Sequence, residues 1–494
     1  GAAGSPIIID SYGSDGGAPV INGNGVDGAA VLLRNQQYWE ICNLEITNQA
    51  EINTGERQGV ILAGDDGSTL QHIYLKNLYI HDIIGYEYES NDSGIFCWVS
   101  DDTCMNDIQI DSCVVEGCTG RGIFTISYNF GDYDGLSGGS FFNTVITNNI
   151  LDHNGGDGIT LSGAYGARVE HNVSRYSHSG WEDSHAVGMF PIAGWNNVFQ
   201  YNESYLTQTT MDGQGFDCDW SALGTVMQYN YSHDNAGGFM LVYFPGYNRG
   251  SVIRYNISQN DRNKVFTISG PVQGAKIYNN TIYLGPAITG DVIRQDNWGG
   301  YPDRIAYYNN IFYVLNDASY LFGQSTNTLF DYNCFYGIHP DSEPDDAHKI
   351  TADPGLVGPG TGGTGRDSVS GYRLQPDSPL ISAGMPMEGN GGLDYWGNPV
   401  SGTGKPNIGA DNSYNRTEAP EPGETVFRDD FEDGDSAGWM PSAGDWVVSD
   451  DGAGNKAYAV TAAGGITAAG DNRWTDYSVS ADVVPSFEDR KSVV

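Results

Sequence analysis

Three aspartates lie close together in the stretch MDGQGFDCDW, at positions 212, 217 and 219. Carboxylates this close repel one another, so we expect the pKa of at least one of them to rise. A raised pKa suits a general acid, and a second carboxylate suits the partner of that acid in glycoside cleavage. The same side chains could instead bind calcium or form part of an acidic surface. Which of these holds depends on the elements that position Asp212, Asp217 and Asp219.

The overall charge limits the classes of partner. The chain has 62 acidic and 23 basic residues, a formal net charge of −39. This balance excludes nucleic acid as a partner and disfavours polyanionic substrates unless metal ions intervene. No run of about eighteen apolar residues is present, so we expect no membrane span. The 68 glycines and the abundant Asn indicate a turn-rich all-β protein. We also expect the protein to be secreted and monomeric. The opening GAAGSPIIID looks like that of a mature or trimmed form.

The cysteines give little further information. Their number, seven, is odd, so at least one thiol is unpaired within the chain. The cluster Cys97, Cys104, Cys113 and Cys118 permits a disulfide. No CxxC pair indicates zinc, and several cysteines are expected to be small core residues.

A repeat organises most of the chain. A short β-branched run, one asparagine and another short strand recur at Asn43, Asn77, Ser112, Asn149, Asn172, Asn202, Asn230, Asn256, Asn280, Asn310 and Asn333. Subtracting successive positions gives spacings from 23 to 37 residues. A variable spacing with a floor in the low twenties is typical of a solenoid whose extra residues form loops. The sequence therefore predicts an all-β, right-handed parallel β-helix of about eleven coils.

Asparagine suits this repeat for two reasons. It tolerates the left-handed backbone of a sharp bend, and its amide both donates and accepts hydrogen bonds, so stacked asparagines can form a ladder. Four glycosylation sequons, at Asn172, Asn202, Asn230 and Asn256, fall on this ladder. We expect these side chains to be engaged in the turns rather than to carry glycans.

The sequence divides into three parts. The predicted β-helix with its irregular C-terminal cap covers residues 1–413, and a Pro- and Glu-rich linker covers 414–425. Residues 426–494 show a different β pattern, in DWVVSD, KAYAV and DYSVSADVV. This part resembles the start of a laminin-G or concanavalin-like β-sandwich.

Strand alternation predicts where the aspartates point. In the Gly-led strand GITLSG, Ile159 and Leu161 should face the core. By the same phase, Phe216, Cys218 and Trp220 of GFDCDW should face inward. Asp217 and Asp219 should then face outward, with Cα atoms about 6.6 Å apart.

The neighbouring strands should supply a sugar-binding groove on the same outward face. Aromatic side chains there can stack on sugar rings, while carboxylates bind hydroxyls. On the following coils we place Met240, Val242 and Phe266 on this face. The candidate substrate contacts are Trp98, Phe124, Trp181, Glu182, Asp183, His185 and Tyr243.

The repeat resembles the secreted bacterial right-handed parallel β-helix proteins that act on carbohydrates, over about residues 6–412, including the ending DYWGNPVSGTGKPNIGAD. DGQGFDCD is similar to the acid-rich coil of the lacto-N-biosidase family. That resemblance implies that Asp212 and Asp219 act as acid/base and nucleophile, with Asp217 in support.

Three functions follow as hypotheses. The first is a polysaccharide-degrading glycoside hydrolase that uses the Asp cluster and requires no cofactor. The second is a calcium-dependent polysaccharide lyase, with the three aspartates as Ca²⁺ ligands and Lys264 as base. The third is a β-helix module that binds carbohydrate without cleaving it. The polygalacturonase set that combines NTD, DD, GHG and RIK is not found, and the DDGxD spacing of one lyase family is not reproduced.

Overall fold

The computed structural model describes residues 1–12, 17–51, 54–86, 91–129, 140–179, 185–243 and 248–413, together with the backbone of four strands between 439 and 469. The chain divides into two compact units, Gly1–Asn415 and Arg416–Val494. In the described part, no helix is long and apolar enough to cross a membrane.

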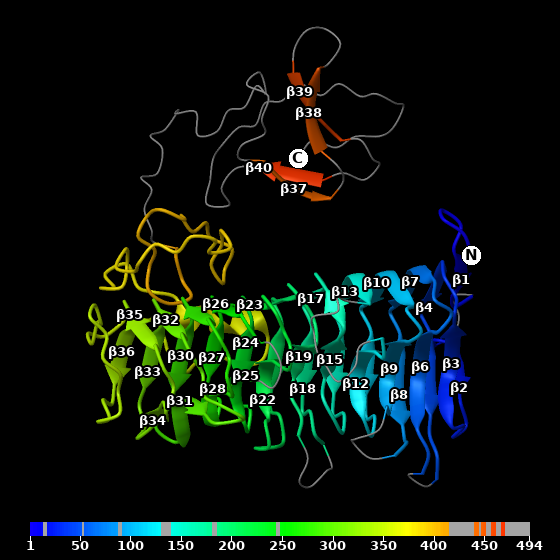
Figure 1. Cartoon of the computed structure of the whole chain (residues 1–494), viewed down its shortest axis with the longest axis horizontal. Helices are drawn as coiled ribbons and strands as arrows, with labels where there is room; N and C mark the ends of the chain where they lie inside the picture. The colour runs from blue at the N-terminus through cyan, green and yellow to red at the C-terminus, as the bar shows by residue number, and fades with distance from the viewer. Residues whose placement is uncertain are drawn as a thin grey trace. The chain divides into compact units, whose positions relative to one another are not determined.

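The first unit is a parallel β-helix, as predicted (Figure 1). Each coil contributes one strand to each of three sheets, and each strand pairs in parallel with strands of the neighbouring coils. Within the described residues, two sheets follow paths of twelve strands and the third has eleven, close to the predicted number of coils.

The first sheet contains β1 (Ile7–Ile9), β4 (Trp39–Cys42), β7 (Thr69–Lys76), β10 (Cys104–Asp111), β13 (Phe141–Thr147), β17 (Arg168–Glu170), β20 (Val198–Gln200), β23 (Val226–Gln228), β26 (Val252–Arg254), β29 (Lys276–Tyr278), β32 (Ala306–Tyr308) and β35 (Leu329–Asp331), with β16 (Ala164–Tyr165) beside β13. The second sheet contains β2 (Val20–Asn22), β5 (Glu45–Asn48), β8 (Tyr79–Ile83), β11 (Val114–Glu116), β14 (Ile150–Asp152), β18 (Val173–Arg175), β21 (Glu203–Tyr205), β24 (Tyr231–His233), β27 (Ile257–Gln259), β30 (Thr281–Leu284), β33 (Ile311–Val314) and β36 (Cys334–Gly337).

The third sheet contains β3 (Gly28–Arg34), β6 (Arg57–Gly64), β9 (Ser93–Val99), β12 (Arg121–Ser127), β15 (Ile159–Ser162), β19 (Met189–Ile192), β22 (Gln214–Cys218), β25 (Gly238–Tyr243), β28 (Asn263–Ser269), β31 (Gly290–Asp296) and β34 (Ser319–Leu321). These are the Gly-led strands that the sequence indicates, and they carry the aspartate cluster.

The core of the column is a stack of apolar side chains held in register from coil to coil. In the third sheet the stack runs through paired, buried residues: Val60, Ile95, Ile123, Ile159, Met189, Phe216, Met240, Phe266 and Ile293. Because a strand places alternate side chains on opposite faces, the residues that follow each of these project outward. The predicted phase is therefore right for β22.

A ladder of buried asparagines fixes the bend between the first and second sheets. The amide of each asparagine from Asn149 to Asn310 donates to the side-chain oxygen of the next one, over 2.9–3.1 Å, as far as Asn333. All four sequon asparagines belong to this ladder and are fully buried. The ladder ends at Asp346, which accepts hydrogen bonds of 2.9 Å from both the backbone N–H and the amide of Asn333.

The residue in the left-handed bend and the residue in the ladder are neighbours in the chain, not the same residue. The predicted repeat, which assigns both roles to one asparagine, is corrected in this respect. Asn43, Asn77 and Ser112 have φ of 56°, 52° and 56°, and their counterparts are Asn148 and His171, one residue before the ladder asparagines. In the first coils the ladder position is taken by the buried residues Leu44, Leu78 and Cys113. The asparagine ladder therefore starts only at Asn149, whose side-chain oxygen accepts the N–H of Cys113.

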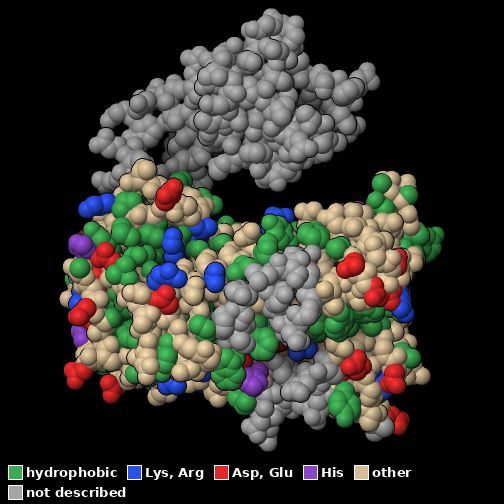
Figure 2. Space-filling view, viewed as in Figure 1, with side chains coloured by type: hydrophobic (Ala, Val, Ile, Leu, Met, Phe, Trp, Pro, Cys, Tyr) green, Lys and Arg blue, Asp and Glu red, His purple; other side chains and the backbone are tan. Residues whose placement is uncertain are grey.

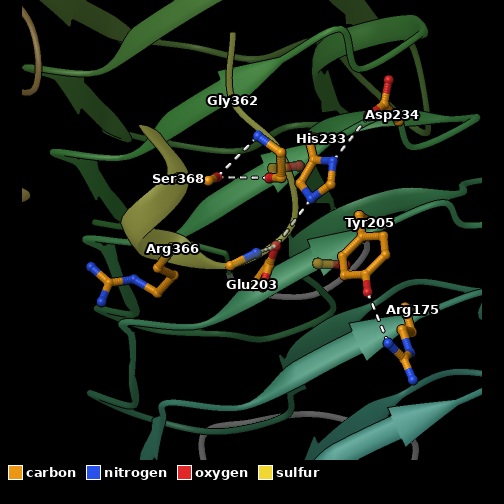
Figure 3. Close-up of polar contacts among 12 residues, drawn as sticks. Arg175, Glu203, Tyr205, His233, Asp234, Gly362, Arg366 and Ser368 are labelled. Atoms are coloured by element: carbon orange, nitrogen blue, oxygen red, sulfur yellow. Dashed lines mark hydrogen bonds and ion pairs between the residues drawn. The ribbon is translucent and has the colours of Figure 1, made fainter. Parts of the chain in front are cut away.

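The sequence predicts that the irregular segment after residue 341 caps the last coil, but this segment also packs along the second sheet, against Tyr231, Tyr283 and Ile311 of earlier coils. It contains the 3-10 helix η1 (Arg366–Tyr372). Figure 3 shows His233 of β24 between Glu203 of β21 and Asp234, with contacts of 3.1 and 2.9 Å. The N–H of Gly365 in the cap donates to the same Glu203 carboxylate over 2.7 Å. A buried ion pair of the column thus also anchors the cap.

The seven cysteines are all unpaired thiols in this structure. Cys97, Cys113 and Cys118 are buried in the core, as the sequence suggests, and no disulfide joins them to Cys104.

In the second unit, two antiparallel pairs are described: β37 (Trp439–Ala443) with β40 (Ile466–Ala469), and β38 (Trp446–Asp450) with β39 (Lys456–Val460). The strands β38 and β39 match DWVVSD and KAYAV, whereas DYSVSADVV lies outside the described residues. The likeness to laminin-G stays a prediction.

Candidate active site

The aspartate cluster lies on and around β22. Phe216 and Cys218 are fully buried in the core. Asp217 lies between them and pairs with Leu241 of β25, on the outward face. Asp219 follows the strand and is half-buried, and its backbone N–H donates to the carbonyl oxygen of Pro191 over 3.1 Å.

Asp212 reaches the cluster from the turn that precedes β22. Its φ of 61° places it in the left-handed region, and it forms a parallel bridge with Ala186 of the preceding coil. The side chain is half-buried. Burial raises the pKa of Asp212, and weaker electrostatic interactions with His185 and Lys264 oppose that rise.

The three predicted acids therefore share one electrostatic environment. Burial raises the pKa of Asp217 well above its usual value, and the negative charges of Asp219 and Asp212 raise it further. Burial also raises the pKa of Asp219 to about 8, although a 2.7 Å hydrogen bond from the N–H of Trp220 opposes this rise. At neutral pH Asp219 is thus mainly protonated.

One oxygen of Asp217 has no hydrogen-bond partner. Asp217 is only 2% exposed, and its Oδ1 is buried without a partner. The side-chain oxygen of Gln214, at the start of β22, is also buried without a partner. Unpaired buried oxygens are costly, so both are suited to accept hydrogen bonds from a bound molecule.

A fourth acid, Asp157, belongs to the same cluster and was missed in the sequence. Its charge raises the pKa of Asp212, Asp217 and Asp219. Asp157 is buried, and its Oδ2 contacts Arg121 at 3.0 Å and accepts a 2.9 Å hydrogen bond from Thr160. The available signal was its place directly before Gly158, which matches the place of Gln214 before Gly215.

Some predicted orientations are wrong. Met240, Val242 and Phe266 are fully buried in the core, and Leu241 and Tyr243 face outward instead. The reason is an extra inward residue at the corner of this coil: Phe239 and Met240 are adjacent and both lie in the core, after Gly238 with φ of 140°. This break in alternation resets the strand phase.

Trp220 also differs from its prediction. It is half-buried outside the core, with its ring centroid 6.3 Å from that of Tyr243. Burial raises the pKa of Tyr243, and the charges of Asp219 and Asp212 raise it further. The Tyr243 hydroxyl is therefore close enough to the cluster to interact with it electrostatically. The structure thus brings Tyr243, which the sequence suggests as a substrate contact, to the aspartates.

The remaining candidate contacts are distributed along the same face. Phe124 is 7% exposed and stacks on Phe96, with centroids 5.2 Å apart. Trp98 is half-buried on β9, four strands from β22. His185 is exposed. Trp181, Glu182 and Asp183 lie outside the described residues.

No group of three His, Cys, Asp or Glu side chains that could hold a metal ion is found among the described residues. The calcium-dependent arrangement of Asp212, Asp217 and Asp219 stays a prediction.

Comparisons with known proteins relate the chain to one kind of enzyme. No family model matches it. It is 28% identical over 530 residues to a lacto-N-biosidase from Bifidobacterium longum subsp. longum, an alignment that covers 83% of this chain and 32% of that protein. The chain therefore spans about a third of the length of this curated relative.

The fold is also shared with a solved structure. A GH136 lacto-N-biosidase from Eubacterium ramulus superimposes with a TM-score of 0.51 and 24% identity, over 67% of this chain and 59% of that one. The chain is thus homologous in sequence to a lacto-N-biosidase and has the parallel β-helix fold of a GH136 lacto-N-biosidase.

Proposed function

We propose that this protein is a glycoside hydrolase that acts on oligosaccharides through the aspartate cluster on β22. The observation that carries the proposal is the difference between two half-buried acids. Asp219 keeps its proton at neutral pH, with a pKa of about 8. Burial also raises the pKa of Asp212, but interactions with His185 and Lys264 oppose that rise. Glycoside cleavage uses two carboxyl groups whose surroundings set their pKa values apart.

The roles follow from these states. Asp219 donates its proton to the glycosidic oxygen as the bond from that oxygen to the sugar carbon breaks. The Asp212 carboxylate supplies the second function, either by attacking the sugar carbon or by taking a proton from the attacking water. Asp217, with its unpaired Oδ1, accepts a hydrogen bond from a substrate hydroxyl or N–H group.

The sequence relative supports a narrower choice of substrate. Because the B. longum protein is a lacto-N-biosidase, we propose lacto-N-biosidase activity as the first one to assay. An acidic chain with a net charge of −39 is also better suited to a neutral glycan than to a uronate polymer.

The test is sugar release by the full chain and by single variants. Asp219→Asn and Asp212→Asn keep the side-chain volume but remove the carboxyl chemistry, so each should lower kcat/KM by about 10²–10⁴-fold. Asp377→Asn, at an exposed cap position, is the matched control and should leave the rate unchanged. The proposal fails if Asp219→Asn retains the parental rate.

The two other hypotheses give different results in the same assay. A lyase would release an unsaturated product that absorbs in the ultraviolet, and a chelator would stop it. A binding module would be retarded in glycan-containing gels but would release no sugar, and the two Asn variants would then change binding alone.

A further inference from the structure

A hollow lies on the outward face of the third sheet, among the N-terminal coils. It has a volume of about 500 Å³. Its apolar lining comes from β6, β9 and the end of β12: Ile61, Phe96, Trp98 and Tyr128. We call it the N-terminal hollow. Figure 2 shows acidic and hydrophobic side chains close together on these coils.

The N-terminal hollow and the aspartate cluster lie on the outward side of the same sheet, and the side chains between them are buried. Phe96 pairs with Phe124, Phe124 with Thr160, and Thr160 with Phe190, each one strand further along the sheet. The next strand is β22 with Asp217. Four strand spacings separate Phe96 from Asp217, or about 19 Å at roughly 4.8 Å per spacing.

The aromatic side chains of the hollow form a surface on which a flat apolar ring can lie. Tyr128 is 51% exposed, and its ring centroid is 6.3 Å from that of Trp98, with the planes at 63°. Phe96 lies deeper, at 4% exposure, and its stacking on Phe124 holds it in place. An exposed tyrosine beside a half-buried tryptophan, above a fixed apolar base, is unusual for a face in contact only with water.

The polar rim of the hollow selects against anions. Asp27 and Glu56 are exposed there, and the described lining contains no Lys or Arg. The nearby Arg57 is turned into the wall, where its guanidinium donates to the carbonyl oxygen of Gly25 over 3.0 Å and to the Asp27 carboxylate over 3.4 Å. Gln58 is buried and donates to the carbonyl oxygen of Asn91 over 3.0 Å, so the wall is rigid.

We propose that the N-terminal hollow binds neutral sugar units of an extended glycan, about 19 Å from the point of cleavage. Sugar rings present apolar faces to Trp98 and Tyr128, and their hydroxyls donate hydrogen bonds to Asp27 and Glu56. The link between this hollow and cleavage rests on the proposed function, but binding itself does not. The protein therefore prefers chains long enough to reach both places.

The test measures binding in the Asp219→Asn background, so that turnover does not consume the ligand. The probes are galacto-oligosaccharides and cello-oligosaccharides graded in length, with oligogalacturonate as the anionic comparison, and the readout is Kd by calorimetry. Tyr128→Ala and Trp98→Ala should each raise the Kd of the longest neutral chains roughly 3- to 10-fold, which is the effect of losing one aromatic contact. Disaccharides should bind unchanged.

Two controls keep the result specific. Tyr128→Phe retains the ring and should bind as the parent does. Tyr165→Ala removes a tyrosine that is 40% exposed on β16, outside this sheet, and should have no effect. Because Tyr128 is exposed, its variant tests the proposal even if Trp98→Ala folds poorly.

Three outcomes would overturn the proposal. One is equal binding of long chains by Tyr128→Ala and the parent. Another is an equal loss for short and long chains. The third is a dimer in sedimentation that Tyr128→Ala abolishes, which would assign the hollow to a second copy of the chain. If Asp219→Asn still cleaves, the proposed catalytic role fails, while the dependence of binding on length still tests the hollow.

Discussion

Truncation of one ladder asparagine, Asn230→Ala, should strongly destabilise the column next to the candidate active site. Asn230 is fully buried between β23 and β24. Its amide donates to the carbonyl oxygen of Phe199 over 2.9 Å and to Asn256 Oδ1 over 3.0 Å. Its own oxygen accepts the backbone N–H and the amide of Asn202, over 3.0 and 3.1 Å.

The size of the loss follows from these four hydrogen bonds. The backbone N–H of Asn202 is left buried without its partner, at a cost of about 1–3 kcal/mol. The other three bonds contribute about 0.5–1.5 kcal/mol each. We therefore expect the free energy of unfolding to fall by roughly 3–6 kcal/mol, a large part of the stability of an ordinary domain.

Urea unfolding followed by circular dichroism measures this loss, with Asn77→Gly as the control. Asn77 is an exposed asparagine of the same repeat, and its φ of 52° suits glycine. Its amide donates only to Asn43, at the surface. The control should cost at most about 1 kcal/mol. If Asn230→Ala lowers the midpoint no more than Asn77→Gly does, the ladder does not stabilise the fold as argued here.

Three further predictions concern titratable groups. Activity should follow a bell-shaped pH profile: it falls above about pH 8 as Asp219 loses its proton, and it falls at low pH as Asp212, whose pKa burial raises, becomes protonated. Burial raises the pKa of Asp261 from 3.8 to about 7, so the contribution of this carboxyl group to stability is complete below about pH 4 and is lost as pH rises through 7. The free energy of unfolding of the parent should fall by roughly 4 kcal/mol over this range. Urea midpoints of Asp261→Asn should not show this fall. A thiol reagent followed by mass spectrometry should label the half-buried Cys104 before the fully buried Cys118, and equal rates would contradict the described core.

Much of the fold could be predicted because the repeat is local. One coil after another shows the same apolar alternation and the same asparagine, so stacking follows from the sequence alone. The register of the ladder could not be predicted in the first coils. Asn43 and Asn77 share the residue type but occupy the bend, because leucine takes the buried place after them.

The candidate site was predictable only where strand alternation is regular. Asp217 follows from its buried neighbours Phe216 and Cys218. Tyr243 and Met240 do not, because the corner after Gly238 places two successive residues in the core. Asp157 comes from an earlier coil, and only the three-dimensional stacking brings it beside the aspartates of β22.

The carboxylate that ends the ladder gives the column a direction. An asparagine side chain accepts hydrogen bonds through its oxygen and donates others through its amide nitrogen. Asp346 only accepts them, from Asn333 and from the N–H groups of Tyr332 and His348. The chain of hydrogen bonds along the ladder must therefore end at the last coil. Duplication of an internal coil would lengthen the column and leave the asparagine ladder continuous. Duplication of a segment that includes Asp346 would instead divide the ladder into two parts, each ending at its own aspartate.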